Sequence, residues 1–286
     1  MAELIDGVVR AAIPRNTRNW IKSPSRSFQW LWDYFRFSLG ITRSLQLAPD
    51  WSPACHPAAY RVMRDAQLGD PDQSEEFRNF LTHCSDAMFL FDIGAHFGTF
   101  SLAAAHFGGK AVAVDPSPEA CKMIATQAAL NGLAPGIRIV QAAVSDSVGT
   151  LEMLSTGAFS GWFFKAASGA ANRGEVRVES LTIDEMTSRF GVPTHIKIDV
   201  EGHEAAVLRG ARDTLKRYDP LLFLELHNDV IRSNGGDPGS ILDELSDLGY
   251  PVLGLDGHRI GKSELIRHSI LHVMAGHSAL PSRVHL

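Results

Sequence analysis

The sequence predicts an α/β protein with a seven-stranded, mostly parallel sheet, helices on both faces of that sheet, and a helical N-terminal extension. Apolar runs alternate with helical patterns from residue 88 to residue 275, which is typical of a parallel sheet. The run at residues 88–91 has no polar alternation, as expected of a strand buried on both faces. Of the 286 residues 45% are hydrophobic, which is enough for one full core and an appendage.

Each predicted strand is a short apolar run that ends at a polar residue or a turn. We place the seven strands at residues 88–91, 111–114, 137–142, 195–199, 221–226, 250–255 and 270–275. Helices are expected at residues 58–66, 75–83, 119–131, 205–216 and 237–248. Two more short strands, 151–154 and 176–178, flank a glycine-rich excursion at 157–174, which we interpret as an acceptor-side loop. Residues 1–85 are expected to form the extension and residues 86–286 the main domain.

The turn after the first strand indicates a small-molecule site. It reads D-x-G-x-x-x-G, with Asp92, Gly94 and Gly98 at the three fixed positions. A dinucleotide site would read G-x-G-x-x-G, so the missing middle glycine disfavours a pyrophosphate. A carboxylate before the turn suits a ligand with a positive or donor-rich end, and S-adenosylmethionine has both properties. The alternative is an ordinary strand-to-helix turn.

Three residues that follow the second and third predicted strands extend this interpretation. Asp115 lies 23 residues beyond Asp92, near the distance at which an acidic residue meets a ribose diol. The alternative for Asp115 is helix capping, a task for which Ser117 is equally suited. Ala143 and Ser145 are small enough to leave room for an adenine, whose edge Ser145 would bond; alternatively they form a plain turn.

A second charged group follows the fourth and fifth strands. Lys197 and Asp199 lie two apart on one strand face, so we expect them to pair. Ligands of open α/β sheets gather at the carboxyl ends of the strands. The two strands deliver five polar side chains to that rim: Asp199, Glu201, His203, Glu225 and His227. Each alone has the ordinary interpretation of a satisfied polar residue, but their convergence favours a reactive site.

Several motifs together resemble the FkbM family of S-adenosylmethionine-dependent methyltransferases, across about residues 86–255. The matching blocks are F-D-I-G-A-H-F-G at 91–98, V-D-P at 114–116, A-V-S-D at 143–146, S-L-T-I-D at 180–184, K-I-D-V-E-G-H-E at 197–204 and V-L-R-G at 207–210. The resemblance implies a Rossmann-like fold and O-methylation of sugars or natural-product hydroxyls. It also implies that Asp92, Gly94 and Gly98 surround the methionine part of the cofactor and that Asp115 holds the ribose, although relatives more often have Glu at position 115.

We therefore predict an S-adenosylmethionine-dependent O-methyltransferase that acts on a hydroxyl of a small molecule, sugar or natural product. The predicted cofactor-binding residues are Asp92, Gly94, Ala95, His96, Gly98, Asp115, Ala143 and Ser145. His227 or His203 is expected to be the general base, with Asp199 and Glu225 orienting it or the acceptor. A less favoured alternative is Mg²⁺ held by Asp199, Glu201 and Glu225.

Two other classes stay open at this point. A nucleotide-dependent oxidoreductase is disfavoured by the absent G-x-G-x-x-G pattern. The second class is a non-catalytic protein that keeps the fold and binds a membrane surface or a partner. It is motivated by the aromatic segment 28–37, which lies within the basic N-terminal part of the chain. For residues 20–41 we favour packing over the main domain or a sister subunit, as in a homo-oligomer, over peripheral membrane contact.

Composition bounds the partners and the compartment. The formal net charge of -5 and the pI of about 6.2 argue against nucleic-acid binding through a basic surface. Residues 1–45 differ, because they hold seven Lys and Arg against three acidic residues. The three cysteines have no zinc or redox spacing, and residues 1–10 lack a signal-peptide pattern, so we expect a cytoplasmic protein. The C-terminal histidines, including His272, share no metal spacing and are interpreted as surface or core residues.

Overall fold

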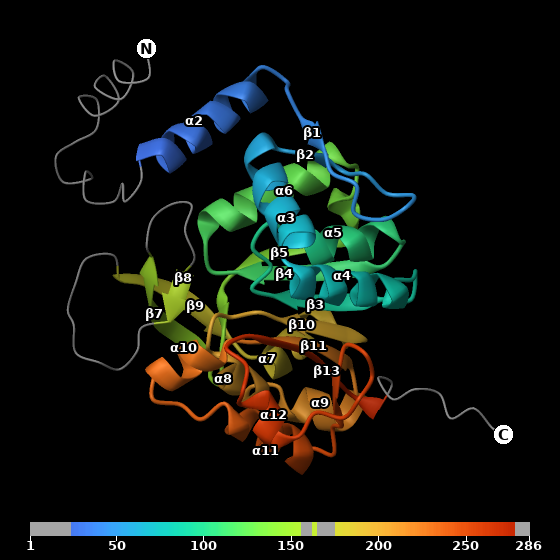
Figure 1. Cartoon of the computed structure of the whole chain (residues 1–286), viewed down its shortest axis with the longest axis vertical. Coiled ribbons are helices and arrows are strands. Elements are labelled where there is room, and N and C mark those ends of the chain that lie inside the picture. The colour runs from blue at the N-terminus through green and yellow to red at the C-terminus, as the bar shows by residue number, and fades with distance from the viewer. Residues whose placement is uncertain (1–23, 156–161, 165–174, 278–286) are drawn as a thin grey trace.

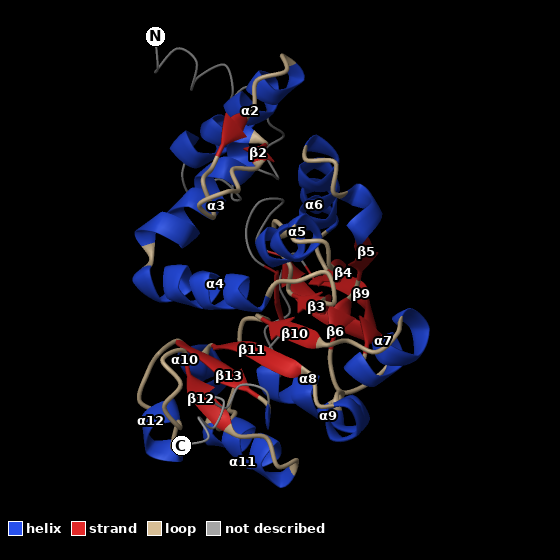
Figure 2. Cartoon of the chain, turned by 90° about the vertical axis from the view of Figure 1, so that its right-hand side faces the viewer, coloured by secondary structure: helices blue, strands red, loops and turns tan. Residues whose placement is uncertain are grey.

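The main sheet of the protein contains seven strands, as predicted. In the computed structural model, which describes residues 24–155, 162–164 and 175–277, their order is β12-β13-β11-β10-β3-β4-β5 (Figure 2). Only β13 runs antiparallel to its neighbours, so the sheet is mostly parallel. The bounds are β3 Phe89–Ile93, β4 Lys110–Asp115, β5 Ile137–Gln141, β10 His195–Ile198, β11 Leu221–Leu226, β12 Val252–Gly254 and β13 Leu271–Ala275. The predicted fold class is confirmed.

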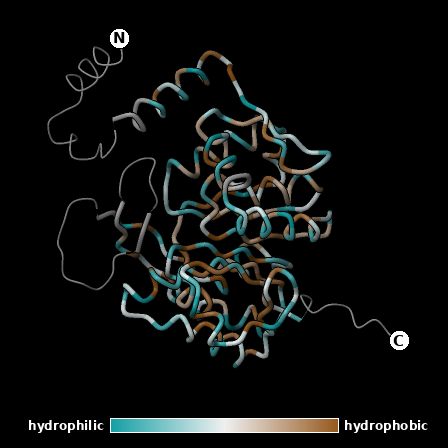
Figure 3. Tube along the Cα trace, viewed as in Figure 1, coloured by the Kyte–Doolittle hydropathy of each residue, from teal (hydrophilic) through white to brown (hydrophobic). Residues whose placement is uncertain are grey.

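Helices cover both faces of this sheet (Figures 1 and 2). Alternate strand residues face opposite cores: Leu90 packs with Phe80 and Leu102, whereas its neighbour Phe91 packs with Val207. The first face carries α3 Pro57–Gly69, α4 Pro71–His83, α5 Thr99–His106 and α6 Pro118–Leu130. The second carries α7 Ile183–Phe190, α8 Glu204–Arg209, α9 Arg212–Tyr218 and α11 Gly239–Asp247. Figure 3 shows the hydrophobic segments concentrated along the central strands.

A second, four-stranded sheet lies beside the main one (Figure 1). Its order is β6-β9-β7-β8, with bounds β6 Ala143–Val144, β7 Gly149–Ser155, β8 Trp162–Phe164 and β9 Glu175–Leu181. The short strands predicted around the glycine-rich excursion belong to β7 and β9. Apart from β8, the excursion at 157–174 lies outside the described residues, so its assignment as an acceptor-side loop stays a prediction.

One predicted helix is two helices. We expected a continuous helix at residues 205–216, but α8 ends at Arg209 and α9 begins at Arg212. At the break, a Cβ on Gly210 would lie 2.1 Å from the backbone oxygen of Ser145. The Gly210 carbonyl accepts a hydrogen bond from the Asp184 backbone N–H at 3.0 Å. The prediction was wrong because helical periodicity does not register this close approach of another segment.

The N-terminal extension is helical, as predicted, and is anchored to the main domain. Its described part, from residue 24 onward, contains α2 Pro24–Ser38, the short pair β1 Arg43–Ser44 and β2 Ala54–Cys55, then α3 and α4. Asn131 of the α6 C-cap receives the Ala54 N–H and donates to the Ala54 carbonyl, both at 2.8 Å. Gln127 accepts the His56 N–H at 2.7 Å. The boundary between residues 85 and 86 stays a prediction. No helix within the described residues is long and apolar enough to cross a bilayer.

The remaining short elements of the described chain lie in the β4–β5 connection and in the C-terminal half. They are η2 Ala134–Gly136, α10 Asn228–Ser233 and α12 Lys262–Leu265. The buried amide of Asn228 donates to the Leu265 carbonyl at 2.6 Å, so the start of α10 is held against α12. This contact fixes the segment that follows the last residue of β11, where the polar side chains of the predicted site lie.

Candidate active site

A pocket opens at the carboxyl ends of β3 and β10, the place where ligands bind in open α/β sheets. Its volume is about 280 Å³, and the helices α3 and α4 form its outer wall. Of the predicted site residues, the pocket is lined by Asp92, Gly94, Ala95, His96, Asp199 and Glu225. The others lie outside its lining: Gly98, Asp115, Ala143, Ser145, His203 and His227. The structure therefore brings the first-strand turn together with the ends of the fourth and fifth parallel strands.

The turn after β3 presses against the end of β10. Gly94 has a φ of +79°, and its N–H donates to the Val114 carbonyl at 2.9 Å. A Cβ at this position would lie 1.8 Å from the backbone oxygen of Asp199. Glycine is required there because only a residue without a side chain permits this approach. The contact places the β3 turn beside Asp199 at one edge of the pocket.

Gly94→Ala is expected to destabilise the protein. The alanine would be strained at positive φ and would also clash with the Asp199 carbonyl, at a cost of about 1–3 kcal/mol for each effect. Gly132→Ala is the matched control, because Gly132 has a φ of +68° but no atom within 4 Å of the added Cβ. Chemical denaturation of both variants measures the difference. An equal loss of unfolding free energy in the two would contradict the proposed clash.

Asp92 holds the start of α5. Its Oδ2 accepts the backbone N–H of Ser101 at 3.0 Å and the Ser101 hydroxyl at 2.6 Å. The carboxylate is buried, and burial raises its pKa to about 6. Because Asp92 also lines the pocket, one side chain both fixes the helix and presents an acidic group to a ligand.

Asp115 binds two backbone N–H groups. Its Oδ2 accepts from His96 at 2.9 Å and its Oδ1 from Ser117 at 2.8 Å. The helix cap that we weighed as the alternative for Asp115 is Ser117, whose hydroxyl accepts the Ala120 N–H at 3.2 Å. The bond from His96 ties the end of β4 to the pocket turn at His96, which has a φ of +49°. Burial raises the pKa of Asp115 to about 6. Each carboxylate oxygen of Asp115 keeps a second lone pair, so these two hydrogen bonds are compatible with ribose binding, which stays a prediction.

Ser145 and His203 lie together, but away from the pocket lining. The Ser145 hydroxyl and the His203 Nε2 are 2.8 Å apart. Burial lowers the pKa of His203, which favours the neutral ring. Ala143 is buried with Met153 and Val178 in the core of the second sheet. These positions form one region beyond β6, separate from Asp199 and Glu225.

Lys197 is the buried centre of the polar network under α4. Its Nζ lies 2.9 Å from Glu76 Oε1 and 3.6 Å from Glu225 Oε2. The expected pair with Asp199 is corrected: the nearest carboxylate comes from Glu76 of the N-terminal extension, 121 positions away in sequence. Burial alone would lower the pKa of Lys197, but the two carboxylates raise it above its ordinary value. The lysine is therefore a permanent internal cation.

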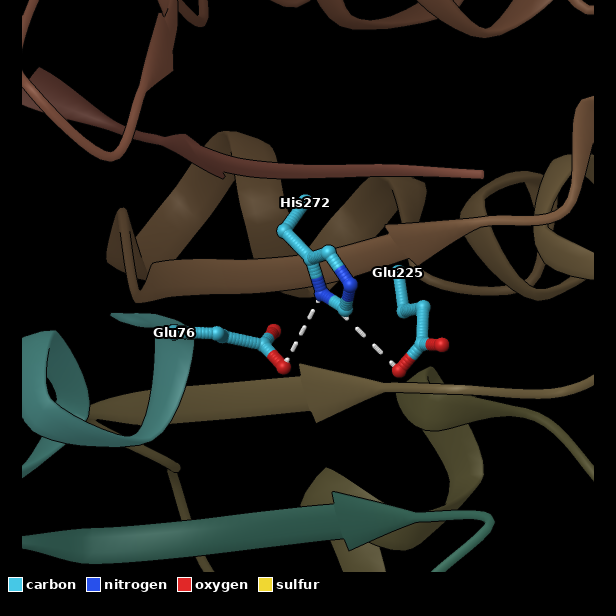
Figure 4. Close-up of side chains that lie close together, drawn as sticks. All are labelled: Glu76, Glu225 and His272. Atoms are coloured by element: carbon cyan, nitrogen blue, oxygen red, sulfur yellow. Dashed lines mark ion pairs between the residues drawn. The ribbon is translucent and has the colours of Figure 1, made fainter. Parts of the chain in front are cut away.

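Glu76 and His272 are site residues that sequence reasoning missed. His272 Nδ1 lies 3.2 Å from Glu76 Oε2 and 3.9 Å from Glu225 Oε2 (Figure 4). Burial would raise the pKa of Glu76, but Lys197 and His272 lower it to about 2. Glu76 shares its helical face with Phe77 and Phe80, and a carboxylate on an apolar face was the available signal. His272 carried no comparable pattern.

His227 is surrounded by carboxylates. Its Nδ1 lies 3.0 Å from Glu204 Oε1, and its Nε2 lies 3.5 Å from Glu201 Oε2, 3.6 Å from Glu225 Oε1 and 3.9 Å from Asp199 Oδ1. Burial would lower the pKa of His227, but the hydrogen bond to Glu204 and the nearby negative charges raise it to about 9. The imidazole is therefore protonated at neutral pH. Burial and the adjacent Glu225 charge raise the pKa of Asp199 well above its usual range.

Two clusters of potential metal ligands occur among the described residues: Glu76 with Glu225 and His272, and Asp199 with Glu201 and His227. The oxygen donors that the Mg²⁺ alternative requires thus partly come together, although Glu225 belongs to the other cluster. Each cluster already contains or adjoins an internal cation, Lys197 in the first and protonated His227 in the second. Each cluster therefore has a positively charged neighbour, although carboxylates outnumber cations in the pocket as a whole.

The pocket suits a cationic ligand. Five carboxylate side chains and one ammonium group are among its lining residues: Glu76, Asp92, Asp199, Glu201, Glu225 and Lys197. Glu201 and His96 also share an uncommon backbone, with positive φ values of +53° and +49°. Such strain persists only where the surroundings enforce it, and it collects at functional sites. The surplus of negative charge fits the sulfonium and ammonium groups of S-adenosylmethionine.

The sheet order, the β3 turn and the acidic pocket define the class of protein: an enzyme with the Rossmann-like fold of S-adenosylmethionine-dependent methyltransferases. A model of the methyltransferase FkbM domain matches residues 92–252, more than half of the chain. The chain belongs to the FkbM methyltransferase family, and its cofactor is S-adenosylmethionine. Family membership confirms the resemblance and removes the oxidoreductase alternative.

Solved structures with a similar fold are distant in sequence. A methyltransferase FkbM from Methylobacillus flagellatus is 16% identical with a TM-score of 0.45, covering 77% of this chain and 54% of that one. An S-adenosylmethionine-dependent O-methyltransferase from Thermotoga maritima is 10% identical with a TM-score of 0.40, covering 77% and 70%. An rRNA methylase from Streptococcus thermophilus is 10% identical with a TM-score of 0.42, covering 73% and 97%. The chain thus spans about half the length of the first of these proteins. No curated protein sequence matches it.

Proposed function

We propose that this methyltransferase is an O-methyltransferase that acts on a hydroxyl group of a small molecule, sugar or natural product. The observation that supports it most is a carboxylate of raised pKa, Asp199, at the wall of the cofactor pocket. A hydroxyl is a poor nucleophile until its proton is removed, and a base of raised pKa removes it more readily than an ordinary carboxylate. Methylation of an alcohol needs this proton acceptor.

In this mechanism Asp199 is the general base. S-adenosylmethionine supplies an electrophilic methyl group when it is bound. Asp92 and the Gly94 turn line the pocket beside Asp199, and Asp199 accepts the hydroxyl proton of the acceptor. Alignment of the hydroxyl oxygen with the methyl carbon is the remaining requirement, and a fixed pocket supplies it.

The two histidines that we considered as bases take other roles in this proposal. His227 is protonated at neutral pH and therefore accepts no further proton; it holds Asp199, Glu201 and Glu225 in place. His203 lies outside the pocket lining and contacts Ser145, which favours a role beside the adenosine. Glu225 contacts Lys197 and His227, and in this proposal it orients the neighbouring carboxylate of Asp199.

The N-terminal extension forms the acceptor wall of the pocket in this proposal. Val62, Met63 and Ala66 of α3 face the site from one side, and Gln73 of α4 adds one amide group. An apolar wall opposite a polar floor suits an acceptor with one apolar face and an oriented hydroxyl. This proposal therefore assigns part of the acceptor choice to residues outside the part matched by the family model, in addition to the predicted acceptor-side loop at 157–174.

Incubation of the protein with S-adenosylmethionine carrying an isotope-labelled methyl group tests the proposal. Sugars, hydroxylated natural products and matched compounds bearing amines in place of hydroxyls are offered in parallel. We expect label in the hydroxyl compounds, with the methyl carbon bonded to oxygen in the NMR spectrum. Transfer confined to the amine series would contradict O-methylation while leaving the methyltransferase assignment intact.

A further inference from the structure

The helix α2 packs one face against the body of the protein and leaves its opposite, apolar face exposed. Asp33 is buried, and its Oδ2 lies 2.9 Å from the Arg61 guanidinium of α3. Trp30 meets Phe97 edge to face, with ring centroids 6.1 Å apart, and Phe37 lies 4.4 Å from the His56 ring. We expected residues 20–41 to pack over the main domain or a sister subunit, and one face of α2 does pack on the body of the protein. The helix lies at one end of the molecule (Figure 1).

The opposite face, which we call the α2 apolar face, consists of Leu31, Trp32, Phe35, Leu39 and the following Ile41. Their exposed fractions are 58%, 43%, 51%, 62% and 45%. The Trp32 and Phe35 rings are stacked at 5.4 Å, so the face is continuous at its centre. Single exposed apolar residues are normal, but a group on one helix face marks an interaction site. Within the described residues, nothing covers this face.

The charge of the residues around the α2 apolar face indicates which kind of partner binds there. The Arg36 guanidinium lies over the Trp32 ring at 5.3 Å, and Arg43 is exposed nearby in sequence. Among the described residues 24–45, three are basic, and the single acidic residue, Asp33, is already paired with Arg61. A symmetric dimer through α2 would bring the Arg36 side chains of two copies toward the same interface, which costs free energy. An anionic lipid surface would instead neutralise them.

We propose that the α2 apolar face binds the surface of an anionic phospholipid bilayer. Trp, Phe and Leu on one helix face with Arg beside them is the pattern of a helix that lies in the membrane interface. The rings enter the boundary between headgroups and acyl chains, and Arg36 and Arg43 contact phosphates. Trp30, on the inward face of α2, meets Phe97 of the pocket wall, so the helix that carries the proposed surface is packed against the wall of the active site.

Flotation of the full chain with vesicles tests this proposal. We expect the protein to float with vesicles of phosphatidylglycerol and phosphatidylcholine, and less with phosphatidylcholine alone. Binding should weaken at about 1 M salt, where charges are screened beyond about 3 Å. Phe35→Glu/Leu39→Glu should weaken it by at least about tenfold, because two apolar side chains no longer leave water. Arg36→Gln should weaken binding to anionic vesicles only.

The matched control is Val192→Glu/Ile270→Glu, which adds the same charges at two exposed apolar positions in other parts of the chain. It should bind vesicles as the natural protein does. Circular dichroism and calorimetry with S-adenosylmethionine confirm that each variant is folded. Equal flotation of the α2 variant and the control would overturn the proposal. So would a dimer, detected by light scattering without lipid, that the α2 variant abolishes, since a second copy would then cover the face.

Discussion

Lys197→Met is expected to lower the free energy of unfolding by about 3–5 kcal/mol, because it removes one partner of a buried ion pair. The Nζ atom contacts Glu76 at 2.9 Å and Glu225 at 3.6 Å, and all three side chains are at most 6% exposed. Without the ammonium group, Glu76 would stay buried with only His272 as an ion-pair neighbour among the described residues, whereas Glu225 would keep His272 and His227. Chemical denaturation at neutral pH measures the loss.

The pH dependence of this loss has a definite sign. In the natural protein the pKa of Glu76 is about 2, below its ordinary value of 4.5, so its contribution to stability is present above pH 4.5 and is lost as the pH falls toward 2. In Lys197→Met the same carboxylate lacks its cation, so its pKa is expected to rise and protonation becomes favourable. The stability difference between the two proteins should therefore narrow as the solution is acidified below about pH 5.

A double variant separates the buried pair from general effects of the substitution. Lys197→Met/Glu76→Gln should recover part of the lost stability, since the uncompensated carboxylate becomes a neutral amide. Lys216→Met is the control, because Lys216 is an exposed lysine on α9. A Lys197→Met protein as stable as Lys216→Met would contradict the role of Lys197 as the central cation.

The fold was predictable because its signal is local. Apolar runs without alternation mark the parallel strands, and all seven predicted strands are found in the main sheet. The break between α8 and α9 was not predictable, because it depends on the approach of Ser145 to Gly210 across 65 positions of sequence. Periodicity reports which face of an element is apolar, but it does not report how closely another segment passes.

The site was predictable in residue type and only partly in arrangement. The motif around Asp199 and the charged end of β11 correctly indicated a shared polar rim. The predicted partner of Lys197, Asp199, was wrong. The observed partner, Glu76, comes from a helix that the family motifs do not include. The protonation of His227 was also not predicted, because it depends on four carboxylates from two stretches of the chain, three within residues 199–204 and the fourth at Glu225. A histidine with no charged neighbours is mostly neutral at pH 7, and the sequence alone does not show that His227 has such neighbours.

Asp199→Asn is expected to lower kcat by about 10²- to 10⁴-fold, the usual contribution of a general base. The amide has nearly the same shape as the carboxylate but accepts no proton, so cofactor binding should change little in comparison. Calorimetry with S-adenosylmethionine and the labelled-methyl assay measure the two quantities separately. Asp247→Asn, an exposed position at the end of α11, is the control for loss of a carboxylate elsewhere.

The pH profile distinguishes a base from a residue that only shapes the pocket. In the natural enzyme, kcat/KM should rise with pH as Asp199 loses its proton, at a pH above the ordinary range for Asp because its pKa is raised. It should fall again near pH 9, where His227 loses the charge that holds the carboxylates. Asp199→Asn should lack the acidic limb and keep the basic one. Turnover within about tenfold of the natural enzyme, with both limbs intact, would place the base elsewhere.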